Sequence, residues 1–348
     1  MNRVSVAHGD TAGSLATLRD RWAHATISEN GLGRLLGVLA LVTAVASAAH
    51  LGDGAATQTF LLIFTSIVIE ALPFILLGAI ASAAIAVFVP ETAVGRIARL
   101  PLALQVPGAA LSGIAFPVCE CGSVPVARRL IARGVHPSAG IAFMLAAPVL
   151  NPIVLASTWV AYGGHRQGAE MAGARGLLGL VVAVSVGWAI GRTGTPGLLR
   201  RRPYGEEGHA HGHAASRPAA FADHVVSDFL FMGKFIVLGA ALSALMQAVL
   251  PQNALSALGG APLLSALTLM GVAFVLSLCS EADAFVAASF TQFGLGSQLA
   301  FLTFGPVADL KLAALYGATF RRMFLLRLVL FAVTIILVGS LLFEAVVQ

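Results

Sequence analysis

The chain has 348 residues, of which 58% are hydrophobic and only 11% are charged. About 25% of the residues in a soluble domain are charged, so the composition excludes an ordinary soluble protein and indicates a membrane protein. The formal net charge of +5 is better explained by basic cytoplasmic loops than by nucleic-acid binding. Three cysteines are too few for a disulfide framework, which favours ligand or redox chemistry.

The chain divides into a tail, an extra helix and two membrane repeats. Residues 1–32 carry charges of both signs and contain no signal-peptide pattern, so we interpret them as a cytoplasmic N-terminal tail. An extra transmembrane helix is predicted at 33–51. Membrane repeats are predicted at 55–192 and 225–348, joined by a His- and Arg-rich cytoplasmic linker at 193–224.

Apolar segments predict an all-α, polytopic membrane protein, because each is long enough for a membrane helix or hairpin. In chain order they cover residues 33–51, 59–89, 102–134, 139–162, 173–191, 228–250, 262–292, 297–318 and 324–346.

The halves on either side of the linker repeat each other. The segment FILLGAI at 74–80 matches FIVLGAA at 235–241, and Cys119 falls opposite Cys279, 160 residues further along. Chance similarity between apolar helices is the alternative. The shared landmarks include Pro, Cys and Gly rather than only Leu and Ala, which favours a true repeat.

Basic residues predict the topology, because cytoplasmic loops are rich in Lys and Arg. Arg128 and Arg133 stay on the cytoplasmic side only if segment 102–134 enters the membrane and returns as a hairpin. Each repeat then has three crossing helices and one re-entrant or broken-helix hairpin, and an odd number of crossings makes the two repeats inverted. Arg166 and Arg175 fall outside, which is a weak exception to the rule.

The first hairpin carries the motif CECG near its middle. Cys119, Glu120, Cys121 and Gly122 are therefore predicted to form a tip near the bilayer midplane. Irregular backbone at that depth must be buried in protein or line a wet cavity. We expect the two cysteines and the glutamate between them to bind substrate.

The second hairpin carries LCSEAD at the matching position, with Cys279, Glu281 and Asp283. All three cysteines of the chain thus fall at two equivalent tips beside carboxylates, which favours a binding site over buried structural cysteines. Thiolates are ligands for soft cations such as Cu(I) and for zinc, and by the same chemistry for trivalent arsenic. We predict that Cys119, Cys121 and Cys279 bind the metal and that the carboxylates complete the site, with structural ion pairs as the alternative for the carboxylates.

Two later helices carry matched interruptions, AAPVLNPI at 146–153 and FGPVADLK at 304–311. Proline removes a backbone donor, and paired interruptions in two halves of a transporter point to the transport site. Asn151 and Asp309 are therefore predicted to bind substrate, with Lys311 as a partner for Asp309; a kink without a ligand is the alternative. The predicted helix-breaking residues are Pro117, Gly122, Pro125, Pro148, Pro152, Gly305 and Pro306.

Two further features have polar side chains in unusual places. Glu70 lies in the middle of segment 59–89, and a lone intramembrane carboxylate is typical of a proton-coupling site. In the linker, GHAHGH contains His209, His211 and His213, which are either accessory metal ligands or part of a plain soluble linker.

The stretch FPVCECGSVPVARRLIARGVHPSAGIAFMLAAPVLNPIVLASTW at 116–159 resembles the predicted permease family that includes organoarsenical efflux permeases. The resemblance covers about residues 55–345 and rests on P-x-C-x-C-G-x-x-P, a Gly-punctuated turn and A-P-x-x-N-P. The matched residues are Pro117, Cys119, Cys121, Gly122, Pro125, Gly134, Pro148, Asn151 and Pro152.

This resemblance implies a polytopic inner-membrane permease whose paired cysteines take part in substrate recognition. Some relatives are associated with trivalent organoarsenicals and others with copper or zinc. The chain departs from the arsenical-type pattern at Glu120, where serine is common, and in the stretch APVLNP. An arsenical specificity is therefore not carried over.

The sequence as a whole predicts a secondary transporter of the cell inner membrane that exports a thiophilic cation or metalloid. Its expected partners are the lipid bilayer and the small substrate, with no nucleic acid and no cofactor, and the oligomeric state is left open. The chain has no GxxxxGK[ST] motif for ATP hydrolysis, and we expect no enzyme activity. The alternatives are a membrane thiol oxidoreductase, although a Cys-x-Cys disulfide would be strained, and a channel-like or scaffold protein whose tips merely pack.

Overall fold

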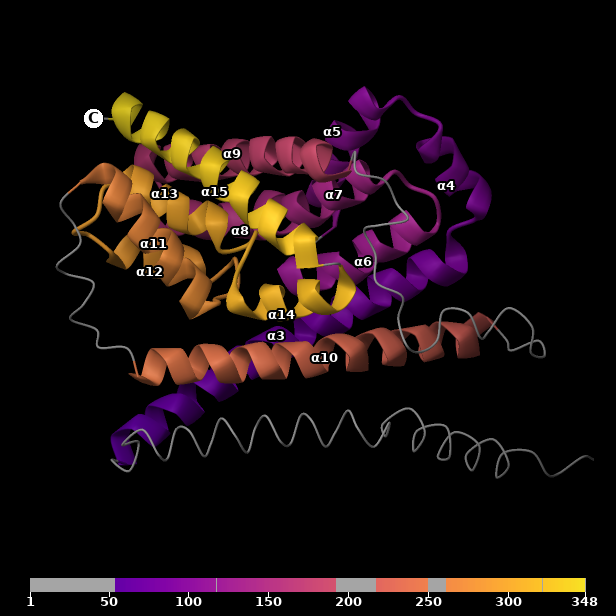
Figure 1. Ribbon diagram of the computed structural model, residues 1–348, viewed down its shortest axis with the longest axis horizontal. Coiled ribbons are helices and arrows are strands. Elements are labelled where there is room, and N and C mark those ends of the chain that lie inside the picture. The colour runs from indigo at the N-terminus through magenta and orange to yellow at the C-terminus, as the bar shows by residue number, and fades with distance from the viewer. Residues whose placement is uncertain (1–53, 117, 192–216, 250–260, 321, 348) are drawn as a thin grey trace, which may run out of the picture. The chain divides into compact units, whose positions relative to one another are not determined.

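The computed structural model describes residues 54–116, 118–191, 217–249, 261–320 and 322–347 (Figure 1). These residues form helices and no β-strand. The helices are α3 (Gly54–Phe88), α4 (Glu91–Ala98), α5 (Leu102–Ser112), the 3₁₀ turn η1 (Gly113–Ala115), α6 (Glu120–Ala132), α7 (Pro137–Leu150), α8 (Pro152–Ala161), α9 (Arg166–Gly191), α10 (Arg217–Val249), α11 (Pro262–Leu276), α12 (Asp283–Ser289), α13 (Leu295–Phe304), α14 (Leu310–Thr319) and α15 (Arg322–Val347).

Five spans in the described part of the chain are long and apolar enough to cross a membrane. They are Thr57–Phe88, Pro137–Ala161, Arg166–Ile190, Arg217–Ala248 and Met323–Val347. Shorter apolar helices, including α11 and α13, lie between them. This confirms the prediction of an all-α, polytopic membrane protein.

Three expected segments lie wholly or largely outside the described residues. The extra helix at 33–51 and the tail before it belong to this part, as does most of the predicted linker. Helix α10 begins at Arg217, inside the segment expected as linker, and therefore extends beyond the apolar stretch that starts at residue 228. The helix can begin at Arg217 because Pro218 is the only proline or glycine in the sequence from 217 to 227, and the first turn of a helix tolerates proline.

The first hairpin turns back on itself within the protein. The beginning of α5 and the end of α6 line one recess, to which Leu102 and Ile131 both contribute. At the other end of α5, Gly113 packs against the backbone of Ala147 in α7. Both arms thus start from the same end and meet at depth, as a re-entrant segment requires.

The second hairpin repeats this arrangement around α13. Ala273, near the end of α11, lies close to Gly305. In the repeat, Ala273 corresponds to Gly113 of η1 and Gly305 corresponds to Ala147 of α7, so this contact is the equivalent of the contact between η1 and α7. Helix α12 runs antiparallel to α13, because its first residue lies near Gly305 while the Phe290 carbonyl, just beyond its last turn, accepts a hydrogen bond from Gln298. Two equivalent contacts in the two halves support the repeat that the sequence indicates.

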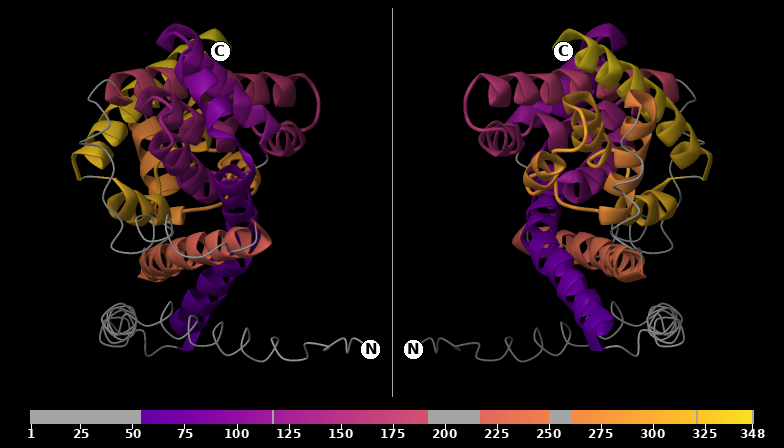
Figure 2. Two further views of the ribbon diagram at one scale, coloured as in Figure 1. Left: turned by 90° about the vertical axis from the view of Figure 1, so that its right-hand side faces the viewer. Right: turned by 90° about the vertical axis from the view of Figure 1, so that its left-hand side faces the viewer.

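The long helices α3 and α10 are the equivalent helices of the two repeats, and they lie side by side (Figures 1 and 2). Ser82 donates a hydrogen bond to Asp228 over 2.7 Å, and the rings of Phe88 and Phe221 lie 5.8 Å apart. The end of α3 therefore faces the beginning of α10, so the two helices are antiparallel. Antiparallel equivalents are what inverted repeats produce.

On the opposite side of the hairpins, α9 contacts its own counterpart α15 (Figure 1). The re-entrant and broken elements lie between these two helix pairs. The two tips and the two breaks themselves are buried, as Cys119, Asn151, Cys279 and Asp309 show, which is the condition for irregular backbone inside a membrane.

The packing around the hairpins differs between the two repeats. Helix α3 packs along α6, where the backbones of Gly78 and Gly122 come close enough that no Cβ would fit at residue 78. Helix α10 instead packs along α14, where Gly239 meets the Cα atom of Lys311. The equivalent helices α3 and α10 thus pack against different elements: α3 packs against the hairpin of the first repeat, and α10 packs against the broken helix of the second.

Candidate transport site

The first tip is an extended segment followed at once by a helix. Cys119 has φ −72° and ψ 174° and caps α6, which begins at Glu120. Glu120, Cys121 and Gly122 therefore form the first turn of a helix and not the irregular tip itself, which corrects the sequence prediction. Polar groups are stabilised at such a position by the free N–H groups of the first helical turn.

The second tip begins where α11 ends. Ser277 has φ 50°, in the left-handed region that non-glycine residues rarely adopt. Its hydroxyl donates to the carbonyl of Phe274 over 3.2 Å and accepts from the N–H of Leu310 over 3.1 Å. These contacts hold the strained residue in place and tie the second tip to the start of α14.

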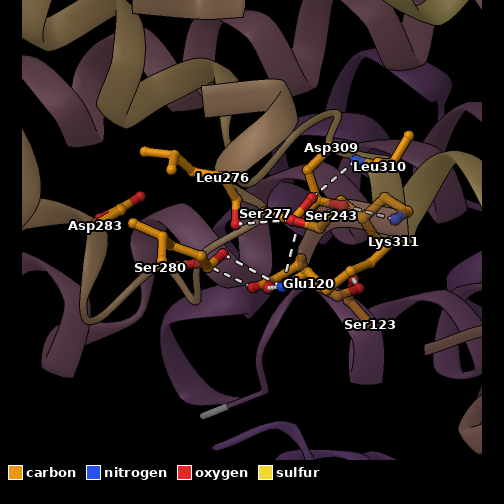
Figure 3. A network of polar contacts seen from close by, with 12 residues as sticks. Glu120, Ser123, Ser243, Leu276, Ser277, Ser280, Asp283, Asp309, Leu310 and Lys311 are labelled. Atoms are coloured by element: carbon orange, nitrogen blue, oxygen red, sulfur yellow. Dashed lines mark hydrogen bonds and ion pairs between the residues drawn. The ribbon is translucent and has the colours of Figure 1, made fainter. Parts of the chain in front are cut away.

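The two tips meet. Ser280 donates a hydrogen bond to Oε2 of Glu120 over 2.9 Å, across a sequence separation of 160 residues (Figure 3). The equivalent cysteines Cys119 and Cys279 are separated by the same number of residues along the chain, so Glu120 and Ser280 are equivalent positions of the two repeats. Equivalent residues of two repeats can touch only near the axis that relates them, so this contact lies on the pseudosymmetry axis.

Lys311 lies beside this contact and is fully buried. Its ammonium lies 3.3 Å from Oε1 of Glu120 and 3.4 Å from Oδ2 of Asp309, and it donates to the carbonyl of Leu278 over 3.3 Å (Figure 3). The expected pairing of Lys311 with Asp309 is present, and the structure adds Glu120 of the other repeat to it.

The three cysteines are buried, free thiols. Cys119 and Cys121 are separated in the chain only by Glu120, and Cys279 directly precedes Ser280, the residue that contacts Glu120. Within the described residues, no group of three or more His, Cys, Asp and Glu side chains is placed to hold a metal ion. Binding by all three thiols would therefore require the tips to rearrange.

Arg175 of α9 is a buried partner of the second tip, a role that the sequence pattern did not predict. It pairs with Asp283 over 2.9 Å and donates to the Thr158 hydroxyl over 2.8 Å and to the Ser280 carbonyl over 3.1 Å. Arg175 lies within the apolar segment predicted at 173–191, and α9, which begins at Arg166, carries it into the bundle. An arginine at the margin of an apolar segment was the available signal.

Glu281 has no such partner. Neither of its carboxylate oxygens makes a hydrogen bond to a described residue, although both are shielded from solvent. It interacts electrostatically with Glu120, Arg175 and Glu70. The structure thus brings Glu70 of α3 within electrostatic reach of the second tip.

The two predicted interruptions are real breaks in otherwise continuous spans. Asn151 accepts a hydrogen bond from the N–H of Ile153 over 3.0 Å and caps α8. Asp309 accepts from the N–H of Leu312 over 2.6 Å and caps α14 in the same way. Asn and Asp are favoured at this position because their oxygens satisfy N–H groups that the helix leaves free.

The predicted helix-breaking residues differ in what they do. Pro152 occupies the first turn of α8, and Gly305 and Pro306 lie in the break between α13 and α14. Pro148 stays inside α7, two residues before its end. Pro117 and the linker histidines His209, His211 and His213 lie outside the described residues.

Pro125 and Gly122 do not break a helix. Both lie within α6, which continues to Ala132. Pro125 has no N–H and cannot make the usual helical bond to the carbonyl of Cys121, a loss that the tight packing of this helix tolerates. Gly122 is required for the close approach of α3.

Two inverted halves that bring buried charges and broken helices together at their common axis define a polytopic membrane permease. The chain belongs to the predicted permease family ArsP_1, whose model matches residues 56–345.

The chain is similar to named proteins of this kind. It is 42% identical to the UPF0718 protein YcgR of Bacillus subtilis over 282 residues, which cover 80% of this chain and 95% of that protein. It is 34% identical over 281 residues to a Streptococcus mutans protein named "Putative two-component membrane permease complex subunit", covering 77% of this chain and 89% of that protein. No solved structure matches the chain.

Proposed function

We propose that this permease is a secondary transporter of the cell inner membrane, with its N-terminus in the cytoplasm, that exports a thiophilic metal ion or metalloid such as an organoarsenical. The observation that carries the proposal is the contact of Glu120 with Ser280 on the pseudosymmetry axis, beside all three cysteines of the chain. Inverted-repeat transporters bind their substrates at the interface of the repeats, near the midplane.

The thiols supply the selectivity in this proposal. Cys119 and Cys121 bind the soft solute from one repeat, and Cys279 approaches it from the other, because sulfur ligands prefer soft cations. Export also requires release. An incomplete thiolate set with carboxylates releases an ion more readily than a closed four-cysteine site, which holds zinc permanently.

The carboxylates and helix breaks supply charge and orientation. Glu120, Glu281, Asp283 and Asp309 offset the charge of a cation, and Asn151 lines the break of the first repeat. The beginnings of α8 and α14 point free N–H groups and a positive dipole end toward the break. Such helix ends are the ion-binding elements of transporters built from broken helices.

Glu70 is the proposed proton-coupling residue. It lies on α3 within electrostatic reach of Cys279 and Glu281. Carboxylates within membrane helices are commonly parts of proton relays, and export against a gradient needs a coupled ion.

A thiol oxidoreductase fits these observations less well. Thiol–disulfide exchange requires that an attacking thiolate reach the sulfur, and Cys119, Cys121 and Cys279 are each buried. The ion pairs and paired helix breaks also have no part in that reaction.

The proposal is tested by the double variant Cys119→Ser/Cys121→Ser. We expect loss of tolerance to copper, zinc, arsenite or an organoarsenical in cells that depend on this permease, with a rise in the cell content of the same solute. Serine preserves the size of each side chain but offers a hard oxygen in place of a soft sulfur. The readouts are growth and elemental analysis of washed cells.

Thr334→Ser is the matched control. Among the described residues, Thr334 hydrogen-bonds only to Leu330 of its own helix, and it is exposed on α15, so this equally conservative change should leave tolerance unaltered. If the wild type protects cells and the double cysteine variant protects them equally, the cysteines have no part in transport.

A further inference from the structure

The ammonium of Lys311 is surrounded by oxygen atoms from three separate segments. Glu120 belongs to the first tip, Leu278 offers its carbonyl from the second tip, and Asp309 caps the helix that carries Lys311. A cation enclosed by oxygen acceptors at the point where two repeats meet is the arrangement expected of a bound cationic substrate. Here the protein's own side chain supplies the cation.

The contacts of Lys311 are long and shared. Its distances to the two carboxylates are 3.3 and 3.4 Å, whereas a charge-assisted hydrogen bond between nitrogen and oxygen is typically about 2.7–2.9 Å. The attraction is therefore mostly electrostatic and is divided among several acceptors. Such an ammonium can be exchanged for another cation without the loss of one short, specific bond.

The backbone of Lys311 is fixed while its side chain is long. Gly239 of α10 packs directly against the Cα atom of Lys311, so helix α14 cannot easily carry the residue away. Four flexible methylene groups separate that Cα atom from the charge. Displacement of the ammonium therefore needs only a change of side-chain conformation.

The charges around the tips favour a cation. Lys311 contacts two carboxylates, Glu120 and Asp309, and neither oxygen of Glu281 has a hydrogen-bond partner among the described residues. Arg175 is engaged with Asp283. Among the described residues at the tips, the four carboxyl groups of Glu120, Glu281, Asp283 and Asp309 thus outnumber the two bases that contact them, Lys311 and Arg175, which suits the binding of a cation.

We infer that Lys311 is a tethered competitor for the transported cation: its ammonium holds the place between the tips that the substrate enters, and its return displaces the substrate. This inference rests on the proposed function and narrows it, because only a positively charged solute competes with an ammonium. The substrate class becomes a soft cation, of which Cu(I) is the type, and neutral trivalent arsenicals are excluded from this competition.

The test measures binding and export by the purified full-length permease. The cationic probe is silver(I), which shares the charge and thiolate preference of Cu(I), and the neutral probe is phenylarsenic(III) oxide. Lys311→Met removes the competing charge but keeps a long side chain. We expect this variant to bind silver(I) about tenfold more tightly or better, because a like charge a few ångströms away is removed. Export of silver(I) from loaded proteoliposomes slows, since nothing displaces the ion, and the affinity for the arsenical is unchanged.

Lys234→Met is the matched control. Lys234 is a second lysine of a membrane helix, located on α10 over the rings of Phe231 and Phe235 at 5.1 and 5.2 Å. This change alters the charge of the protein equally, and we expect wild-type affinity for silver(I). An equal tightening in both variants would overturn the inference, because it would reflect net charge alone.

A second pair of variants, both carrying Glu120→Gln, keeps the test possible if Lys311→Met alone does not fold. If Lys311→Met alone does not fold, Glu120→Gln is compared with Glu120→Gln/Lys311→Met, in which the number of unbalanced charges is smaller. Loss of the lysine must tighten silver(I) binding in this background too. Unchanged or weaker silver(I) binding in folded protein overturns the inference.

The two proposals fail in different ways. A wild-type permease that neither binds nor exports silver(I) or the arsenical contradicts the proposed function itself. A wild type that binds and exports silver(I), with a Lys311→Met variant of unchanged affinity and rate, contradicts only the role of Lys311.

Discussion

At the scale of single residues, Arg175 shows how one buried cation links separate elements. It connects α9 with Thr158 of α8 and with both Ser280 and Asp283 at the second tip. Arginine suits this position because its planar group donates in several directions at once. The second tip is therefore anchored to the first repeat by a side chain outside the proposed binding set.

We predict that Arg175→Met destabilises the permease by about 3–5 kcal/mol, because Asp283 is left as an unpaired buried charge. Arg175→Lys should cost less, since it keeps the charge but loses the forked hydrogen bonds. Thermal unfolding of the purified protein in detergent measures both effects.

The control for this prediction is Arg175→Met/Asp283→Asn. Removing both charges should recover much of the stability lost in the single variant, as expected for directly paired groups. Additive losses in the double variant would show that the ion pair is not the source of the effect.

At the scale of elements, the two caps explain how broken helices form in a nonpolar setting. Asn151 and Asp309 each satisfy an N–H group at the start of the second half-helix. Without them, free donors would be buried at a cost of about 1–3 kcal/mol each. The motifs P-x-x-N-P and P-x-x-D-L thus encode both the end of one half-helix and the beginning of the next.

The contact between α3 and α6 gives a prediction for a single methyl group. In Gly78→Ala the new Cβ would clash with the Cα atom of Gly122, so the helices must separate. We expect a loss of about 1–3 kcal/mol of stability, as is typical of overpacking. Thermal unfolding provides the measurement.

Gly233→Ala in α10 is the comparison, because nothing lies within 4 Å of the added atom. An alanine in an open helical position should be neutral or stabilise by about 0.5–1 kcal/mol. Equal stability of the two variants would mean that α3 and α6 do not pack this closely.

At the scale of the whole molecule, the orientation in the membrane is the property with the most direct test. Arg166 is almost fully exposed at the start of α9, and Arg96 is exposed on α4. The positive-inside rule predicts that residue 96 lies in the cytoplasm, and the topology expected from the sequence then predicts residue 166 on the outer side.

We therefore expect Arg166→Cys to react with a membrane-impermeant maleimide in intact cells, and Arg96→Cys to react only after the cells are opened. The wild type is the control, since its three cysteines are buried. Labelling in the reverse order would contradict the predicted topology.

The repeat organisation was accessible from the sequence because its landmarks are chemically distinctive. Cys119 and Cys279 stand at equivalent positions, and the Pro-containing interruptions predict Asn151 and Asp309 at the breaks. Each of these features depends on local backbone chemistry: proline lacks a donor, and short polar side chains cap helices. Hydrophobic runs of the right length likewise indicated the membrane helices.

Only the tertiary structure decided which charges from distant parts of the chain meet. Arg175 and Asp283 are 108 residues apart in the chain, and Lys311 and Glu120 are 191 apart. No local pattern relates such residues, since their contact depends on how two hairpins turn and which faces the long helices cover. The tips approach one another because antiparallel packing of α3 and α10 brings the two halves together. Buried opposite charges then pair because an isolated charge away from water is too costly to leave unpaired.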